Sequence, residues 1–377
     1  MKGGERTAPA YDVRVERLGL LLEPNGRADA AEGALNPAFV LARNGERLLY
    51  PRLVSAGNVS RIGRFRFVGE RELLDDGYAL EPRVPYELRE ADGWGCEDPR
   101  VTYIAALDAY VMAYTAYGPS GARIALAISY AGLTFQRLGL VDFSSCGLPD
   151  HDDKDAAFFP EPVLSPSGRL CLAFYHRPML HLSAVDGVAA IPIIEGLPFD
   201  RREAIRIAYV ELEAAVSDHR ALLHVTESAL VLAPNAHWGS IKVGAGTPPI
   251  RLPEGWLSVF HGVDFRGIEG RERRHLDTDS EYQGVDTRGT EVERPRFSYS
   301  AGLLLHDIER PDRVIYRSPE PFLVAQEPYE RTGIVNNVVF PTGIEPRPDL
   351  GDRVFDLYYG AADYAIAVAR VSLSLVG

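Results

Sequence analysis

Cysteine is scarce in this chain of 377 residues, and its three copies lie far apart, at Cys96, Cys146 and Cys171. Three scattered cysteines exclude a disulfide framework and a cysteine-based zinc site. No segment approaches 18 consecutive apolar residues, so we expect no membrane span. The charged amino-terminal stretch "MKGGERTAPAYDVRVERL" lacks the apolar segment of a secretion signal. We therefore expect a cytoplasmic protein.

Positive charge is also in short supply, because 40 Lys and Arg face 53 Asp and Glu and leave a net charge of −13. Such a chain repels phosphate backbones, which argues against nucleic acid as a partner. A site for an anion would need Arg, Lys and His gathered in one place. The apolar content of 46% and the charged content of 25% are ordinary values for a globular protein.

Long amphipathic helical stretches are scarce as well. The best candidate covers residues 202–222, which could equally form a strand followed by a loop. Instead, a polar or glycine-containing turn leads five times into a short β-rich run. These runs are residues 45–53, 107–118, 167–178, 254–264 and 353–363. A second β-like run follows each of them, at residues 60–67, 122–129, 205–212, 297–306 and 364–373.

Five sheet-like repeats predict an all-β fold, a five-bladed β-propeller with extended loops. We expect residues 1–377 to form a single catalytic domain, with residues 1–34 as an amino-terminal extension. Residues 181–204 and 265–296 look like loop insertions. The second is strongly polar, and it could be a lid, an oligomer contact or a solvated surface loop.

Polar residues stand at matched ends of the five runs, where strands around a common axis would bring them together. They are Arg52, Tyr114, His176 with Arg177, His261, and Tyr359 through Asp363. Taken singly, each has an ordinary structural interpretation as a surface arginine, a hydrogen-bonded histidine or a core tyrosine. Their recurrence at matched positions favours one shared pocket.

The octapeptide "GWGCEDPR" at residues 93–100 holds two adjacent carboxylates, Glu97 and Asp98. Neighbouring side chains on a strand point to opposite faces, so only one of them is expected to face a given cavity. Pro99 biases Asp98 toward extended geometry. The pair could supply a general acid or a sugar-binding carboxylate. It could equally be a turn cap in which Glu97 pairs with Arg100.

The segment "HDDKDAAFFPEPV" at residues 151–163 places Lys154 among acids. These acids together with His151 raise the question of a metal site. No fixed ligand spacing is present, however, and we expect no metal.

Four motifs resemble those of glycoside hydrolase family 130, which contains β-mannoside phosphorylases and related β-mannosidases. The motifs are "GCEDPRVTYI…YVMAYTAYG", "KDAAFFPE…FYHRP", "GAGTPPIRLPEGWLSVFHGVD" and "NNVVFPTGI…LYYGAAD", in the family's order between about residues 35 and 372. The resemblance implies a five-bladed propeller and inverting phosphorolysis, in which inorganic phosphate attacks the anomeric carbon and releases α-mannose 1-phosphate. Phosphate then replaces the carboxylate-activated water of an inverting hydrolase, so one protein acid suffices. No cofactor is implied beyond phosphate as a co-substrate.

The resemblance also implies roles for single residues. Asp98 of the "EDP" motif becomes the general acid, which passes its proton through the mannose 3-hydroxyl. The expected phosphate-binding residues are Arg61, Lys154, Arg177 and His261. The expected substrate-binding residues are Asn36, Arg52, Glu97, Asp155, Tyr114 and Asp363. Many family members carry Arg-Asn in place of Lys154-Asp155, and a carboxylate at Asp155 is unfavourable beside an anion.

Three hypotheses remain open from the sequence. The first is a phosphorylase of β-1,2- or β-1,4-mannosides, with the oligosaccharide and inorganic phosphate as its partners. The second is a β-mannosidase in which Asp155 or Glu161 activates water, and the third is a silent propeller that binds glycans or proteins. The cationic set favours the first, because hydrolases of the family lose part of it. We expect neither nucleic acid nor a membrane as partner, and a homo-oligomer is possible.

Overall fold

The computed structural model describes residues 9–148, 152–179, 196–266 and 296–376, and in these ranges the protein is an all-β structure. One sheet has eight strands, in the order β2-β3-β4-β6-β7-β8-β9, with β5 paired to β4. Its strands are β2 (Gly33–Leu41), β3 (Arg47–Ser55), β4 (Val59–Val68), β5 (Glu72–Leu80), β6 (Trp94–Ile104), β7 (Ala109–Gly118), β8 (Gly121–Ser129) and β9 (Gln136–Leu140).

Three further sheets follow along the chain. The first consists of β10 (Asp153–Phe158), β12 (Leu170–Pro178), β13 (Ile205–Glu211) and β14 (Glu227–Leu232), with β11 (Val163–Leu164) on β12. The second consists of β15 (Lys242–Ala245), β17 (Gly255–Arg266), β18 (Arg296–His306) and β19 (Val314–Arg317), with β16 (Ile250–Leu252) on β17. The third consists of β20 (Val339–Pro346), β21 (Val354–Ala361), β22 (Ala365–Leu375) and β1 (Tyr11–Leu22).

The ten β-rich runs predicted from the sequence are all strands. They are the pairs β3 and β4, β7 and β8, β12 and β13, β17 and β18, and β21 and β22. The region 202–222 contains β13 followed by the short helix α2 (Leu212–Ser217), and another short helix, α3 (Pro328–Arg331), precedes β20. No helix in the described ranges is long and apolar enough to cross a membrane.

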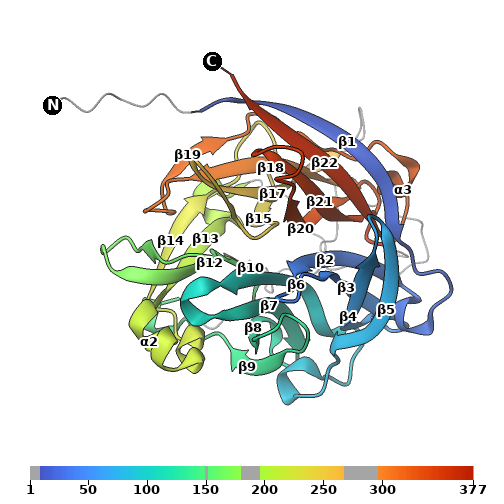
Figure 1. The fold of residues 1–377 in the computed structure, drawn as a ribbon, viewed down its shortest axis with the longest axis horizontal. Coiled ribbons are helices and arrows are strands. Elements are labelled where there is room, and N and C mark those ends of the chain that lie inside the picture. Colours follow the sequence, from blue (N-terminus) through green and yellow to red (C-terminus); the bar gives the residue numbers. More distant parts are fainter. Residues whose placement is uncertain (1–8, 149–151, 180–195, 267–295, 377) are drawn as a thin grey trace.

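The eight-stranded sheet has two halves, β2–β5 and β6–β9, with little backbone pairing between them. The only pairing between β4 and β6 is parallel and links Val59 with Trp94 and Ser60 with Gly95. Tyr50 of β3 and Met112 of β7 lie in one apolar cluster, so the two halves pack against each other through their side chains. The strands β2, β6, β10, β15 and β20, each the first of its group of strands, lie nearest the middle of the molecule in Figure 1.

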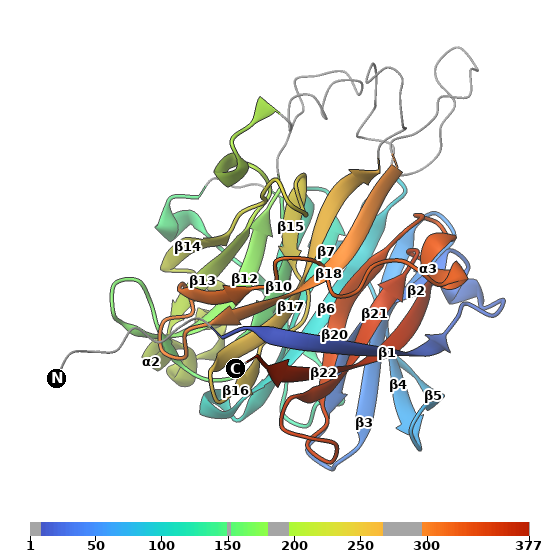
Figure 2. The same cartoon turned by 90° about the horizontal axis from the view of Figure 1, so that it is seen from above.

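The amino-terminal strand β1 closes the last sheet. It runs antiparallel to β22 from the pair Tyr11–Leu375 to the pair Leu22–Ile366. The two strands lie at the outer edge of the molecule in Figure 1 and are again neighbours in Figure 2. This differs from the extension expected for residues 1–34, because residues 11–22 are an integral strand. The expected insertions at 181–204 and 265–296 lie largely outside the described residues.

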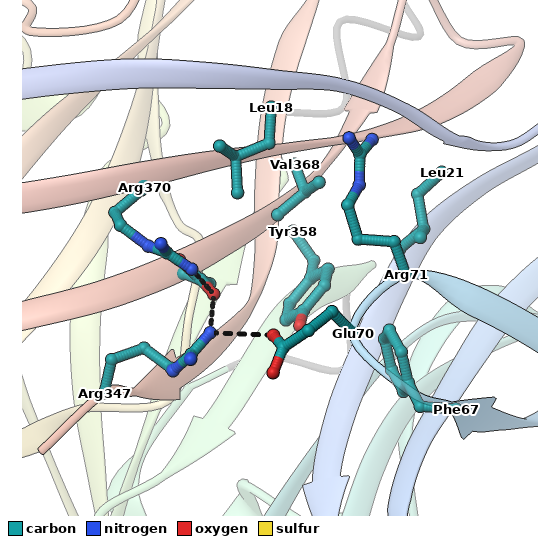
Figure 3. A pocket seen from close by; sticks show the side chains of 10 residues that line it. Leu18, Leu21, Phe67, Glu70, Arg71, Arg347, Tyr358, Val368 and Arg370 are labelled. Carbon is teal, nitrogen blue, oxygen red and sulfur yellow. Dashed lines mark hydrogen bonds and ion pairs between the residues drawn. The ribbon is translucent and has the colours of Figure 1, made fainter. Parts of the chain in front are cut away.

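A cavity of about 310 Å³ lies where this last sheet meets β4 and β5 (Figure 3). Leu18 contributes to its apolar wall, and Arg71, Arg347 and Arg370 contribute to its polar rim. Arg347 and Arg370 both pair with Asp356, at 2.7 and 2.8 Å. None of the residues lining this cavity is among the site residues expected from the sequence.

Candidate active site

Three inner strands carry a β-bulge at an equivalent place, and each bulge presents a polar residue. The strand register shifts between Leu35 and Ala38, between Glu97 and Arg100, and between Lys154 and Ala157. Inside these bulges Asn36, Asp98 and Asp155 have φ angles of 45°, 45° and 61°. Asn and Asp tolerate this left-handed conformation better than other side chains do, and a bulge redirects a side chain out of the strand's alternation.

The bulge corrects two expectations for the octapeptide. Asp98 is left-handed rather than extended, so the influence of Pro99 does not decide its geometry. Glu97 and Asp98 also do not diverge completely, because both contact Arg52. Arg52 Nη2 donates to Glu97 Oε1 at 2.9 Å, and Arg52 Nη1 donates to Asp98 Oδ1 at 3.3 Å.

Arg100 has a different role from the expected pairing with Glu97. It is 1% exposed, and its guanidinium donates to the backbone oxygens of Asp98 at 2.7 Å and Gly246 at 2.9 Å. It thereby ties the bulge of β6 to the end of β15. This positioning role was missed in the sequence, because no pattern marks an arginine that binds carbonyl groups across the middle of a fold.

The Asp98 carboxylate is buried among donors. Its Oδ1 accepts a hydrogen bond from Asn36 Nδ2 at 2.8 Å, and its Oδ2 lies 3.5 Å from Lys154 Nζ. Burial alone raises the pKa of Asp98. The positive charges of Lys154 and Arg52 outweigh burial, and Arg100 and Asn36 act in the same direction. The pKa of Asp98 therefore lies well below its usual range.

Asp155 forms the second half of the cluster. Its Oδ2 accepts a hydrogen bond from Arg177 Nε at 2.7 Å and lies 3.7 Å from His261 Nε2. Burial raises the pKa of Asp155, but Arg177 above all overcomes this effect, so the carboxyl stays ionised. Arg177 also pairs through Nη1 with Glu203, an acid that the sequence patterns did not single out.

His261 is fully buried, and neither of its ring nitrogens has a hydrogen-bond partner among the described residues. Burial lowers the pKa of His261 to about 3, although Asp155 opposes the shift. The ring is therefore neutral near pH 7 and can both donate and accept a hydrogen bond. A side chain at Gly244 would place a Cβ 2.4 Å from Asp155 Oδ2 and from His261 Cε1. This close approach explains why the first residue of the "GAG" motif is glycine.

One predicted site residue, Arg61, lies apart from this cluster. Arg61 is on the opposite face of β4 from Ser60, whose Oγ accepts a hydrogen bond from Arg52, and the Arg61 guanidinium lies 5.7 Å from the ring centre of Tyr78. Asp363 lies in the turn between β21 and β22. This turn contacts the beginning of β2, where Ala34 N donates to Tyr364 O at 3.0 Å.

The prediction of Tyr114 as a site residue is wrong by one position in the strand. In three groups of strands, the second strand (β3, β12 or β17) pairs a site residue with the first strand of the group. These site residues are Arg52, Arg177 and His261. In β7 the residue at the equivalent position is Thr115, which pairs with Glu97 of β6. A shift of one residue reverses the face of a strand. Tyr114 accordingly points into an apolar cluster, where its hydroxyl donates to Glu87 at 2.7 Å.

The remaining candidates have structural partners. His176 Nδ1 lies 2.7 Å from Asp153 Oδ2, within hydrogen-bonding distance. Glu161, one candidate base for hydrolysis, is half exposed and pairs with Arg251 at 3.3 Å. Across the described ranges, no group of three or more His, Cys, Asp or Glu is arranged to hold a metal ion.

Fold and cluster together define an all-β protein with a buried acid surrounded by cations. The family model described as beta-1,4-mannooligosaccharide phosphorylase matches residues 12–186 and 282–376. The chain belongs to glycoside hydrolase family 130.

Two individual comparisons extend over almost the whole chain. The 1,2-beta-oligomannan phosphorylase of Thermoanaerobacter sp. (strain X514) is 28% identical, over 96% of this chain and 98% of the relative. The structure of the beta-1,2-mannobiose phosphorylase of Listeria innocua in complex with beta-1,2-mannobiose superposes with a TM-score of 0.67. The superposition covers 96% of this chain and 97% of the other at 20% identity, and it supports the fold.

Proposed function

We propose that this protein is an inverting β-mannoside phosphorylase that converts β-mannosides and inorganic phosphate into α-mannose 1-phosphate and a shortened acceptor. Membership of family 130 and the phosphorylase relative aligned over 96% of the chain support this activity. The observation that carries it in this chain is the cluster itself, in which the buried Asp98 carboxyl is bordered by Lys154 and Arg52. Two cations beside one buried carboxylate, in a chain of net charge −13, suit an anionic co-substrate.

The positions of the side chains support most of the roles that the resemblance implies. Asp98 is the general acid, and Asn36 and Arg52 orient it while they bind the mannose unit. Lys154, Arg177 and His261 are the phosphate-binding groups. Glu97, Asp155 and Asp363 remain candidates for substrate contacts, and Thr115 replaces Tyr114 in that set. Arg61 could reach phosphate only if the substrate complex differs from this arrangement.

Hydrolysis would require a carboxylate free to activate water. Glu161 is at the surface with Arg251, and Asp155 is held by Arg177 Nε. Glu161 is therefore not placed as a water-activating base. Asp155 is a weak base, because Arg177 above all holds its pKa well below the usual range, and this supports phosphate as the nucleophile.

The five-bladed propeller also belongs to the proposal. The two halves of the eight-stranded sheet share only two parallel pairs and pack through side chains, as separate blades would. Five groups of strands with their first strands nearest the middle (Figure 1) fit this architecture. A single catalytic domain, a cytoplasmic location and a possible homo-oligomer stay predictions.

The test is an assay with β-1,2- and β-1,4-mannobiose, each incubated with and without phosphate. We expect mannose 1-phosphate only when phosphate is present, with the β-1,2 linkage preferred, since the relatives aligned over most of the chain are named for that linkage. Release of free mannose at equal rates without phosphate would overturn the proposal in favour of a β-mannosidase.

A further inference from the structure

Both oxygens of the Asp98 carboxylate face hydrogen-bond donors. Oδ1 accepts from Asn36 Nδ2 at 2.8 Å and from Arg52 Nη1 at 3.3 Å, and Oδ2 lies 3.5 Å from Lys154 Nζ. The side chain of Asp98 is 2% exposed, so solvent does not supply an alternative partner easily. On the backbone of the same residue, Arg100 donates to the carbonyl oxygen at 2.7 Å.

This arrangement is incompatible with a protonated Asp98. A carboxylic acid has an O–H group that must donate, whereas a lysine ammonium has three donors and no acceptor. A proton on Oδ2 would therefore point at the Lys154 ammonium, and a proton on Oδ1 would meet the donors of Asn36 and Arg52. Asp98 can carry the proton that a general acid needs only after one of these donors has left.

Lys154 is the donor that can leave. Asn36 is 3% exposed, and Arg52 is held additionally by Glu97 at 2.9 Å and Ser60 at 2.9 Å. The Lys154 side chain is 21% exposed and ends in a compact charge on a flexible stem. Within the described ranges its ammonium forms one ion pair, with Asp98.

We propose that Lys154 couples phosphate binding to the protonation of the general acid. Phosphate draws the ammonium away from Asp98 Oδ2, and the vacated oxygen takes up a proton. Without phosphate Asp98 stays ionised, so water cannot attack the β-mannoside with the help of an acid. Lys154 is thus a positioning residue that suppresses hydrolysis, and the inference rests on the proposed phosphorylase function.

The proton balance closes over one turnover. The bond between the anomeric carbon and the glycosidic oxygen breaks while the bond to a phosphate oxygen forms, and the Asp98 proton moves to the departing oxygen. The hydrogen phosphate brings one proton of its own. A phosphate monoester loses its second proton with a pKa near 6, so the product releases that proton at neutral pH and replaces the one consumed.

Calorimetry of phosphate binding at pH 7.5, in buffers with different ionisation enthalpies, counts the protons taken up. For each phosphate bound, we expect wild type to bind about one more proton than Asp98→Asn, in which the titrating carboxyl is absent. Equal proton uptake by the two proteins would overturn the coupling while leaving the phosphorylase proposal intact. Failure of wild type to bind phosphate at all would overturn the proposed function and the coupling together.

Lys154 variants give an independent readout. Lys154→Met removes the ammonium from Asp98 Oδ2, so we expect weaker phosphate binding together with at least tenfold faster phosphate-free hydrolysis of β-mannobiose than in wild type. The rate of this hydrolysis should increase toward low pH, as Asp98 becomes protonated. Lys154→Arg keeps the positive charge beside Asp98, so its phosphate-free hydrolysis should stay as slow as that of wild type even where its phosphorolysis is slower. Phosphate-free hydrolysis in Lys154→Met no faster than in wild type would contradict the role of Lys154.

Discussion

The left-handed backbone at Asp98 lets one residue meet donors from three other strands. A regular strand would direct this side chain to one face, but the bulge brings Asn36 of β2, Arg52 of β3 and Lys154 of β10 to the same carboxylate. Such a conformation costs roughly 1–2 kcal/mol for an ordinary residue and less for Asp or Asn. The conformational cost and the lowered pKa both concern the one residue that the proposed reaction uses as an acid.

Replacing this acid tests its role. Asp98→Asn keeps the size and the tolerance of a left-handed backbone, so the fold should be retained. The melting temperature should fall, because Lys154 and Arg52 lose their buried carboxylate. We expect kcat/KM for phosphorolysis to fall by about 10²–10⁴-fold, the usual contribution of a positioned general acid.

Asp108→Asn is the matched control, because Asp108 also has a positive φ, of 48°, but lies exposed in the connection between β6 and β7. It should retain full activity. Activity of Asp98→Asn within tenfold of wild type would remove Asp98 from the acid role.

His261 predicts a dependence of stability on pH. Its pKa is about 3 in the folded protein and about 6.5 in the unfolded chain, so the unfolded state binds more protons between these values. Stability therefore decreases as pH falls from 6.5 toward 3, by up to about 1.4 kcal/mol per pH unit for this group.

Urea unfolding at several pH values measures this effect. The unfolding free energy of His261→Gln should fall less steeply between pH 6.5 and 5 than that of wild type. Buried His306, whose pKa is lowered to about 4, contributes equally to both proteins and cancels in the comparison. Identical slopes would show that His261 is protonated in the folded state.

Sequence reasoning at this scale found the residues that recur and missed those fixed by contacts across the fold. Arg52, Arg177 and His261 follow apolar runs at matched positions, so counting the repeats was enough. Arg100 and Glu203 act through partners more than 20 residues away, namely Gly246 for Arg100 and Arg177 for Glu203. No local pattern encodes these pairings.

At the scale of elements, the sequence predicted the second and third strands of every group but not all of the first ones. Several of the predicted strands are continuous β-rich runs that are buried along most of their length. In contrast, β2, β6 and β10 are interrupted by bulges that break the period of two. The same bulges hold Asn36, Asp98 and Asp155. The elements hardest to predict are therefore those that carry the proposed site.

The peripheral strand β1 allows a prediction about the free energy of unfolding. Arg17 of β1 donates to Glu330 at 2.9 Å, and the Glu330 side chain is completely buried. Arg17→Met leaves that carboxylate without its cation, and breaking a buried pair in this way costs about 3 kcal/mol. We expect urea unfolding to show a loss of this size.

Arg43→Met is the control for the loss of one arginine. The pair of Arg43 with Asp108 is exposed, with side-chain exposures of 47% and 71%, and such pairs contribute about 0–1 kcal/mol. Equal effects of the two substitutions would show that β1 is not fixed through Glu330.

At the scale of the whole molecule, charge is distributed unevenly. A chain of net charge −13 gathers four cations in the middle of the fold and pairs them with four carboxylates. The cations are Arg52, Arg100, Lys154 and Arg177, and the carboxylates are Glu97, Asp98, Asp155 and Glu203. Repulsion between the acidic surface and a phosphate anion makes this cluster the favourable place for it. The fold thus supplies a locally balanced group of charges inside a chain that is acidic overall.

The most direct measurement follows the first minutes of the reaction of β-1,2-mannobiose by proton NMR, with and without phosphate. The account predicts that α-mannose 1-phosphate and one mannose appear together as the disaccharide disappears, and that nothing happens without phosphate. Two molecules of free mannose per disaccharide, formed without phosphate, or a β-configured phosphate product, would contradict it.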